Sequence, residues 1–246
     1  MTQQHPYDAM FSGVIGQHYD TLKLICPLSI EMSRLVGAKV AEHSQHSQHK
    51  LSVVELGGGT GITTLAMLSA SDAITILSVD NEPTMQNQAK QSLQTWAAQG
   101  RLAFSSQDAL SALQGLATNS VDIVASAYTL HNFEHHYRQQ VLAEIFRILK
   151  TGGHFINGDR YGLDNINQHT RTVQQEIAGY FKVLGNMNRL DLLEHWIIHL
   201  FNDESENHIM RETAAIDALA AIGFNNIVLS HRQEVNALVS ATKPTR

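Results

Sequence analysis

Four glycines follow an acidic residue at the end of an apolar run, in the segment 53–61 with the sequence VVELGGGTG. The apolar run indicates a buried strand, and the glycines indicate a loop whose backbone comes very close to a ligand, because glycine has no Cβ to block that approach. The dinucleotide-binding fingerprint needs its third glycine at the sixth position, which is Ile62 here, and no Gly-Lys-Ser/Thr of a phosphate-binding loop follows. The loop therefore predicts a nucleotide-like ligand, bound by glycines whose spacing differs from that of both motifs.

Acidic side chains also follow the next two apolar runs. Asp80 ends the run 73–79, about twenty residues after the glycine loop, and Asp108 closes the run 101–105. Ligands of open parallel sheets bind outside the carboxyl ends of the strands, so we expect these acids to face one crevice. Asp80 can accept two ribose hydroxyls, and Asp108 can accept an adenine amino group beside the amide of Ala109. A turn or a helix cap is the commoner role of each acid alone, and only their combined spacing favours a nucleoside.

The pattern Glu-x-Gly-x-Gly-x-Gly at 55–61 resembles the nucleoside-binding loop of class I S-adenosylmethionine (SAM) dependent methyltransferases, over roughly residues 50–160 of the chain. This resemblance implies SAM as the cofactor. It implies that Met85 lies against the adenine and that Glu55 orders the loop. The segment 11–20 is similar to the amino-terminal helix of these enzymes, which implies Tyr19 as a partner of the SAM carboxylate, with packing as its alternative. The implied cofactor-binding residues are Tyr19, Glu55, Gly57, Gly59, Gly61, Asp80, Asn81, Met85, Asp108, Ala109 and Ser126.

The segment 126–133, SAYTLHNF, follows the apolar run 121–127 at the place where the resemblance puts the transferable methyl group. It lacks the Asn/Asp-Pro-Pro-Tyr/Phe motif of methyltransferases that modify nucleic-acid bases. Its Leu-His-x-Phe form is similar to the loop of ubiquinone/menaquinone C-methyltransferase relatives and other small-molecule enzymes. The resemblance therefore implies transfer of a methyl group from SAM to a small-molecule acceptor by in-line displacement, which requires above all that the acceptor be held close and aligned.

A general base is needed only if the acceptor carries a proton that must leave. His131 is the first candidate, because histidine exchanges protons readily near neutral pH and this loop adjoins the predicted methyl position. Packing or positioning of the substrate is the alternative for His131. Asp159, after the run 154–157, and Tyr161 are the second candidates, and capping of the next helix is the alternative for Asp159.

Short strand-like runs alternate with longer helical ones, which predicts a parallel sheet with helical crossovers. A link of about four residues makes the last two strands an antiparallel hairpin. The predicted fold class is α/β, a Rossmann-like doubly wound seven-stranded sheet, mostly parallel, with amino-terminal helices and a helical lid insertion. Strands are expected at 51–56, 73–79, 101–105, 121–127, 154–157, 224–230 and 235–242, and helices at 62–70, 83–98, 134–150 and 212–222, with two more between 8 and 41.

We expect a single domain over residues 1–246. Its predicted parts are an amino-terminal helical cap (1–49), a SAM-binding core (50–159), a helical substrate lid (160–211) and a terminal helix with the hairpin (212–246). The lid has irregular periodicity and many aromatic residues, which together with Arg189 are expected to line an amphipathic acceptor pocket. An exposed ion pair is the alternative for Arg189.

The composition is that of an ordinary globular protein, with 43% hydrophobic and 16% charged residues. A net charge of −6 without a dense basic patch argues against a nucleic-acid surface. No apolar run reaches the ~18 residues of a membrane span, and the first residues lack the pattern of a signal peptide. Cys26 is the only cysteine, so an internal disulfide is excluded. These features predict a cytoplasmic protein with a small-molecule acceptor and no membrane partner, and leave open a homodimer.

Two further interpretations stay open at this point. His195 and His199 would share a helix face, but no Glu follows His195 to complete the zinc-protease pattern. The histidines at 43, 46 and 49 are explained by a solvated loop. No metal is therefore expected. The alternative functions are a non-catalytic SAM-binding sensor or partner subunit, and an enzyme similar in layout to the carboxy-SAM synthases, which modify SAM itself.

Overall fold

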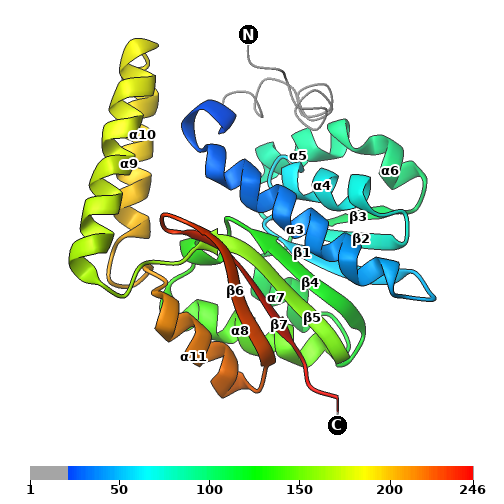
Figure 1. Ribbon diagram of the computed structural model, residues 1–246. Coiled ribbons are helices and arrows are strands. Elements are labelled where there is room, and N and C mark those ends of the chain that lie inside the picture. Colours follow the sequence, from blue (N-terminus) through cyan, green and yellow to red (C-terminus); the bar gives the residue numbers. More distant parts are fainter. Residues whose placement is uncertain (1–21, 246) are drawn as a thin grey trace.

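A seven-stranded sheet in the order β3-β2-β1-β4-β5-β7-β6 forms the centre of the molecule (Figure 1). The structure is a computed structural model and describes residues 22–245. Strands β1 to β5 pair in parallel, and β7 lies antiparallel between β5 and β6. This arrangement confirms the predicted fold class. The strands are β1 (Leu51–Leu56), β2 (Ile74–Val79), β3 (Leu102–Ser105), β4 (Val121–Ala127), β5 (Leu149–Arg160), β6 (Asn225–Gln233) and β7 (Asn236–Thr242).

Helices cover both faces of the sheet and form two apolar cores. Neighbouring residues of β1 show the division, since Val53 belongs to the first core and Val54 to the second. A strand that is buried on both faces needs a nearly continuous apolar sequence, which is why the sequence of β1 does not alternate. The helices of the first face are α3 (Pro27–Gln45), α4 (Ile62–Ala70) and α6 (Gln94–Ala98), and those of the second are α7 (Ala109–Gln114), α8 (His135–Ile148) and α11 (Glu212–Ile222).

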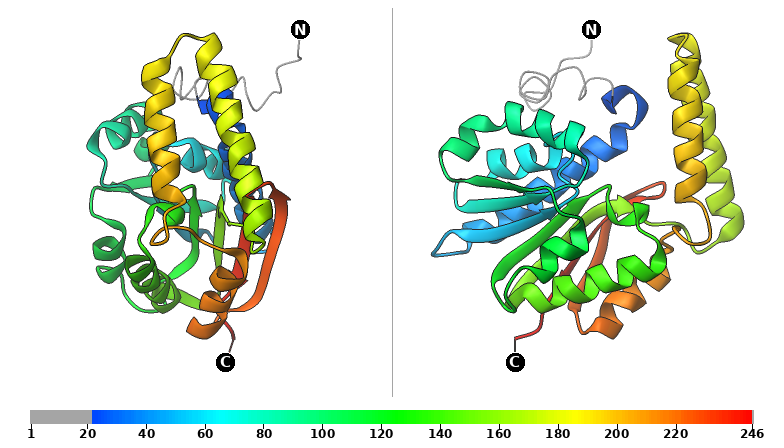
Figure 2. Two further views of the ribbon diagram at one scale, coloured as in Figure 1. Left: turned by 90° about the vertical axis from the view of Figure 1, so that its left-hand side faces the viewer. Right: turned by 180° about the vertical axis from the view of Figure 1, so that it is seen from behind.

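The helices α9 (Ile166–Asn186) and α10 (Leu190–Asp203) form a hairpin that stands at one end of the sheet and extends beyond it (Figures 1 and 2). A small apolar cluster of its own holds the two helices together, including Leu184 and Leu193. Arg160, at the end of β5, fastens the base of this hairpin because its guanidinium donates to Glu176 and Glu204, each at 2.8 Å. The segment predicted as a helical lid with irregular periodicity therefore contains two regular helices.

Several predicted boundaries are wrong. The helix expected over 83–98 is divided at the buried Leu93 into α5 (Pro83–Ser92) and α6. The strand expected over 154–157 is much longer, because β5 begins at Leu149 directly after α8 and passes through Gly152, whose φ of 79° only glycine adopts easily. The helix expected to end near residue 41 continues to Gln45. Within residues 22–245, no helix has the length and hydropathy needed to cross a membrane.

Candidate functional site

A cavity of about 860 Å³ opens at the carboxyl ends of β1 to β4. The chain leaves β1 and β4, which are neighbours, toward opposite sides of the sheet, and ligands of doubly wound folds bind at such a switch point. The cavity lies between these strand ends and α10, which closes its far side. Its lining includes Gly57, Gly59, Asp80, Asn81, Met85, Gln107, Asp108, Ala109, Tyr128, Thr129, His131, Phe133, Trp196 and His199.

The glycine loop lines one wall with bare backbone. Gly57 and Gly59 have φ values of 69° and 51°, in the left-handed region that favours glycine. A Cβ added to Gly57 would lie 1.9 Å from Oγ1 of Thr129, whereas one added to Gly59 would meet no atom within 4 Å. Packing therefore requires the first glycine, and the second leaves open space where a ligand can approach the backbone.

Asp80 joins this loop to the end of β2. Its Oδ2 accepts the backbone N–H of Gly59 at 2.7 Å, and its Oδ1 accepts that of Glu82 at 2.8 Å. A carboxylate offers about four lone-pair sites, so both oxygens keep the capacity to accept a hydroxyl from the cavity. The structure thus places Asp80 where the sequence predicted it, with its orientation already fixed by the protein.

Asp108 caps a helix and also lies at the cavity. It is the N-cap of α7, where its Oδ1 accepts the backbone N–H of Ser111 at 3.0 Å and the hydroxyl of Tyr137 at 2.9 Å. Hydrogen bonds from the Ser111 side chain and from the Ser111 N–H, with that of Tyr137, hold the pKa of Asp108 below its usual value. Asp108 also lines the cavity together with Ala109 and the half-exposed Met85.

Three residues predicted to bind the cofactor lie behind the cavity wall instead. Ser126 is fully buried in β4, and its Oγ donates to the carbonyl of Leu56. Gly61 is the N-cap of α4 and packs against Leu93. Glu55 is fully buried and accepts the hydroxyl of Thr64 at 2.5 Å, and burial raises its pKa to about 7. These residues support the loop and do not line the cavity.

His131 and Asp159 form a buried pair at the opposite wall. The ring Nδ1 of His131 donates to Oδ1 of Asp159 at 2.5 Å, and Oδ2 of the same carboxylate accepts the backbone N–H of Leu130 at 3.0 Å. Burial by itself would raise the pKa of Asp159, but the His131 ring and the N–H groups around the carboxylate hold it below its usual value. An ionised Asp159 therefore fixes the proton of His131 on Nδ1 and leaves a lone pair on Nε2.

Arg138, on α8, holds the loop that carries His131, and this role was not predicted from the sequence. Its side chain is buried, and it donates to the carbonyl oxygens of Leu130, His131 and Phe133 at 2.8, 3.2 and 2.6 Å. An arginine on a helix face normally indicates a solvated charge, so only the tertiary structure identifies it as a positioning residue.

Two residues of α10, Asp203 and His199, lie next to His131. Asp203 is 5% exposed, and its Oδ2 lies 3.6 Å from Nε2 of His131 and 3.6 Å from Nε2 of His199. Burial raises the pKa of Asp203 although both rings lower it, and burial lowers the pKa of His199. The sequence drew attention to His199 but paired it with His195. The structure pairs it with Asp203, one turn in the other direction.

The remaining predicted residues lie elsewhere. Tyr161 is packed in the second apolar core, where its hydroxyl accepts the Asn157 amide at 2.8 Å, and it lines a separate cavity of about 380 Å³. Tyr161 therefore does not line the cavity that contains His131, where its predicted catalytic role would place it. Arg189 forms an exposed ion pair with Asp191 at 2.7 Å, which was its alternative. Tyr19 lies outside the described residues.

Comparisons with known proteins agree with this geometry. Residues 53–153 match the family model described as a methyltransferase domain. Demethylmenaquinone methyltransferase from Leptospira interrogans is 32% identical over 120 residues, which cover 49% of this chain and 47% of the relative. The chain thus spans about half the length of the curated relatives it matches first.

Solved structures share the fold at low sequence identity. An O-methyltransferase family protein from Burkholderia thailandensis superposes with a TM-score of 0.65 at 15% identity, over 99% of this chain and 61% of that protein. The CurJ carbon methyltransferase superposes with a TM-score of 0.57 at 16% identity, over 97% of this chain and 65% of that one. Residues 53–153 thus match a methyltransferase domain, and the chain has the Rossmann-like α/β fold that these solved structures share.

Proposed function

We propose that this chain transfers a methyl group from SAM to a small-molecule acceptor in the cavity between the glycine loop and α10. One observation carries the proposal: the backbone cradle at Gly59, the carboxylate of Asp80 and the His131 ring, which Asp159 holds from behind, face a single cavity of about 860 Å³. Pockets for ligands of this size commonly have volumes of about 300–1,000 Å³.

The donor side of the cavity fits SAM, the cofactor of this class of domain. When bound, SAM supplies a methyl group made electrophilic by its sulfonium. Gly59 leaves the space that an approaching ligand needs, and Asp80 presents two fixed oxygens to the ribose hydroxyls. Asp108, Asn81 and Met85 line the same side, where they are suited to an adenosine. Glu55, Gly61 and Ser126 support this wall from behind.

His131 and Asp159 serve the acceptor side of the cavity. Asp159 holds the imidazole in one orientation, and Arg138 fixes the backbone of the loop. The lone pair on Nε2 of His131 then either takes the proton of the acceptor as a general base or holds the acceptor in line. Asp159 itself has no route to the acceptor, because His131, Leu130 and Arg160 already surround its oxygens. It is a positioning residue.

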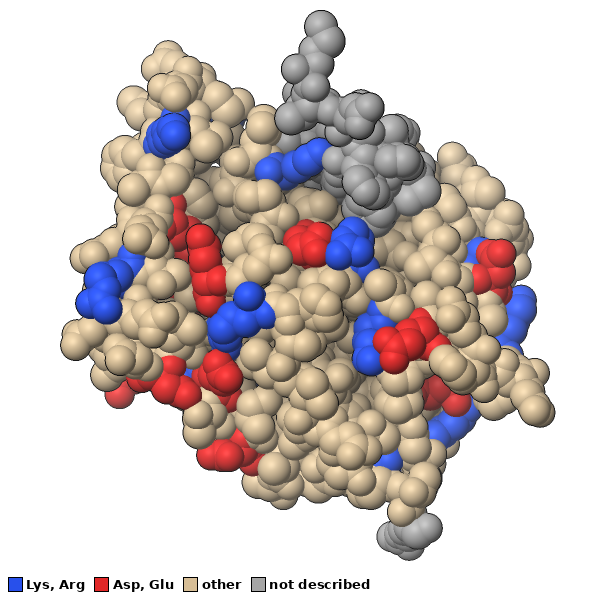
Figure 3. All heavy atoms as spheres, viewed as in Figure 1, with Lys and Arg blue, Asp and Glu red and all other residues tan. Residues whose placement is uncertain are grey.

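The acceptor that this cavity favours is a small aromatic or quinone-like molecule. Tyr128, Phe133 and Trp196 line the cavity and provide flat apolar surface. The similarity to a demethylmenaquinone methyltransferase supports the same class of acceptor. A nucleic-acid substrate is not favoured, since basic and acidic side chains are interspersed over the face shown in Figure 3.

We also propose a cytoplasmic location and a homodimer. The single cysteine suits a reducing compartment. Phe181, Ile198 and Phe201 of the α9–α10 hairpin are 55%, 62% and 69% exposed and offer apolar surface to a second copy. Cell fractionation checks the location, and sedimentation velocity checks the dimer, which is rejected if the chain sediments as a monomer at every concentration.

The test of the function is release of S-adenosylhomocysteine. Purified protein is incubated with SAM and with fractionated metabolite extracts, quinols and phenols, and the product is followed by mass spectrometry together with the methylated acceptor. We expect equal amounts of both products from at least one fraction. If SAM binds but no fraction gives turnover, the protein is a SAM-binding sensor or partner subunit instead.

A further inference from the structure

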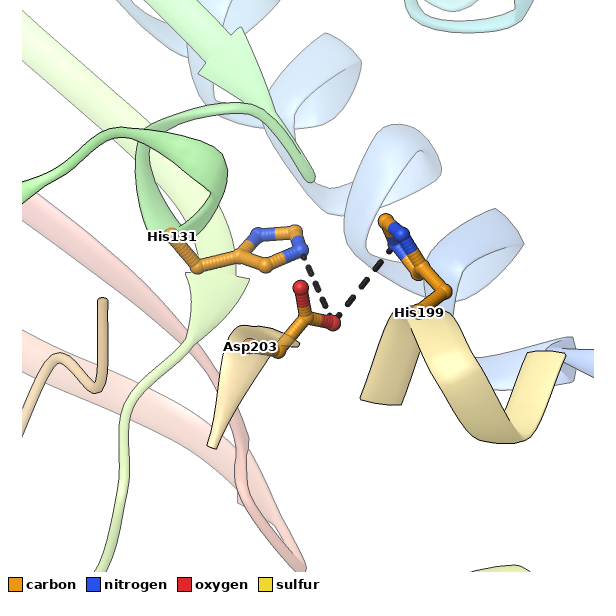
Figure 4. Close-up of side chains that lie close together, drawn as sticks. All are labelled: His131, His199 and Asp203. Carbon is orange, nitrogen blue, oxygen red and sulfur yellow. Dashed lines mark ion pairs between the residues drawn. The ribbon is translucent and has the colours of Figure 1, made fainter. Parts of the chain in front are cut away.

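His131, His199 and Asp203 point toward one another from two separate segments of the chain (Figure 4). His131 comes from the loop after β4, whereas His199 and Asp203 lie one turn apart on α10. One ligand atom from each, Nε2 of the two histidines and a carboxylate oxygen of Asp203, lies within 4.8 Å of the others. The three atoms therefore surround a common point.

The spacing of these atoms does not correspond to hydrogen bonds. Each Nε2 lies 3.6 Å from Oδ2 of Asp203, which is beyond the range of a hydrogen bond between nitrogen and oxygen. Two ligands of one tetrahedral zinc ion, each about 2.0–2.2 Å from the metal, stand roughly 3.3 Å apart. The observed separation is therefore close to that of atoms that share an ion.

Burial makes an unpaired Asp203 costly. The carboxylate is 5% exposed, and its Oδ1 has no hydrogen-bond partner within the described part of the chain. The guanidinium of Arg160, whose charge influences Asp203, is already engaged by Glu176 and Glu204. A buried carboxylate is stable only with a cation or hydrogen bonds, and a metal ion would supply the missing charge.

His131 is already prepared as a ligand. Donation of its Nδ1 proton to Asp159 leaves the Nε2 lone pair directed at Asp203 and keeps the ring from turning. Histidines that bind metals in proteins almost always have such a carboxylate or carbonyl behind them, because it fixes the tautomer and strengthens the ligand.

We propose that His131, His199 and Asp203 bind a divalent first-row transition-metal ion. Two imidazoles and one carboxylate suit Zn²⁺, Mn²⁺, Co²⁺ or Fe²⁺, and three protein ligands leave at least one position open. Both histidines line the cavity, so the open position faces it. The role of this ion rests on the proposed methyl transfer, and it narrows the acceptor to a molecule with a metal-binding oxygen, such as a phenol or an enol.

The ion changes the role of His131 from base to ligand. A hydroxyl bound to the ion loses its proton to water more readily. The acceptor oxygen then forms a bond to the methyl carbon while the bond from that carbon to sulfur breaks, and the sulfur keeps the electron pair as a neutral thioether. His199 and Asp203 act here as metal ligands, and Asp159 holds His131 in place.

The test measures metal binding in the absence of SAM. Full-length protein, stripped with a chelator and dialysed, is titrated with Zn²⁺ and Mn²⁺ by calorimetry and with Co²⁺ by its visible absorption. We expect one ion per chain, with affinity reduced by at least ~100-fold in His199→Ala and in Asp203→Asn. His195→Ala is the matched control, since this exposed histidine lies on the same helix, and it should bind the ion as the wild type does.

The side chain of His199 is 40% exposed, so its replacement should leave the fold intact, and circular dichroism of each variant verifies this. Absence of stoichiometric binding of all three ions overturns the proposal, as does equal loss of affinity in His195→Ala. SAM is titrated separately into the stripped protein. If the protein binds the metal but not SAM, the proposed function is contradicted. If it binds SAM but no metal, only the metal site is contradicted.

Discussion

The two walls of the cavity are built in different ways. The donor wall takes its groups from the loops directly after β1, β2 and β3, and each group lies within a few residues of its strand end. The acceptor wall joins side chains that are distant in sequence, since His131 and Asp159 are 28 residues apart and Asp203 comes from α10. The donor wall is thus determined by local sequence, and the acceptor wall by the neighbouring positions of β4 and β5 and by the hairpin.

The largest effect is expected on the acceptor wall, from Asp159→Asn. Asparagine cannot carry the charge that fixes the imidazole of His131, so methyl transfer should fall by about 10²–10⁴-fold. SAM affinity should stay within about twofold, because the donor wall is untouched. Initial rates and calorimetry of the same preparation measure the two quantities. An unchanged rate would show that the pair has no part in transfer.

Behind the donor wall, the buried Glu55 makes stability depend on pH. Burial raises its pKa from 4.5 to about 7, so between these values the folded protein binds a proton that the unfolded chain has lost. This stabilising contribution is complete below pH 4.5 and is lost as the pH rises to 7. Glutamine does not titrate, so Glu55→Gln does not lose this contribution. Between pH 4.5 and 7, the free energy of unfolding of Glu55→Gln should therefore rise relative to that of the wild type by on the order of 3 kcal/mol.

Urea unfolding of both proteins at a series of pH values measures this gain. Glu206→Gln replaces an exposed glutamate and serves as the control, which should follow the wild type at every pH. Parallel curves for the wild type and Glu55→Gln would mean that Glu55 titrates alike in the folded and unfolded chains.

Asp80→Ala tests the donor wall itself. It removes both oxygens offered to the ribose and leaves the N–H of Gly59 without its partner, so SAM should bind more weakly by about 2 kcal/mol, or roughly 30-fold. Asp72→Ala provides a matched control, because Asp72 precedes the same strand at its other end and its side chain is 99% exposed. Equal affinities for the two variants would remove Asp80 from the site.

The smallest effect separates the two roles of Asp108. Asp108→Ala should lower the free energy of unfolding by about 1 kcal/mol through loss of the α7 cap, whether or not the residue binds a ligand. Asp108→Asn keeps the cap and serves as the comparison. If the alanine variant loses stability but binds SAM like the asparagine variant, Asp108 is a cap alone.

The sequence predicted the order of the elements and most of the donor wall, since each strand end and the residue after it are local features. It did not distinguish Asp80, which lines the cavity, from Ser126, which lies in the sheet, because the register of β4 decides which way each side chain points. Asp203 and Arg138 carried no signal, since an acid or an arginine on a helix face usually indicates solvent. Only the placement of α10 against the loop after β4 brings Asp203 to His131.

Direct titration of SAM and of S-adenosylhomocysteine into the purified protein, by isothermal calorimetry, tests the central claim that the glycine-loop wall binds this cofactor. We predict saturable binding of both at one site per chain, weakened in Asp80→Ala and unchanged in Asp72→Ala. Absence of binding by both compounds to correctly folded wild-type protein would contradict the account.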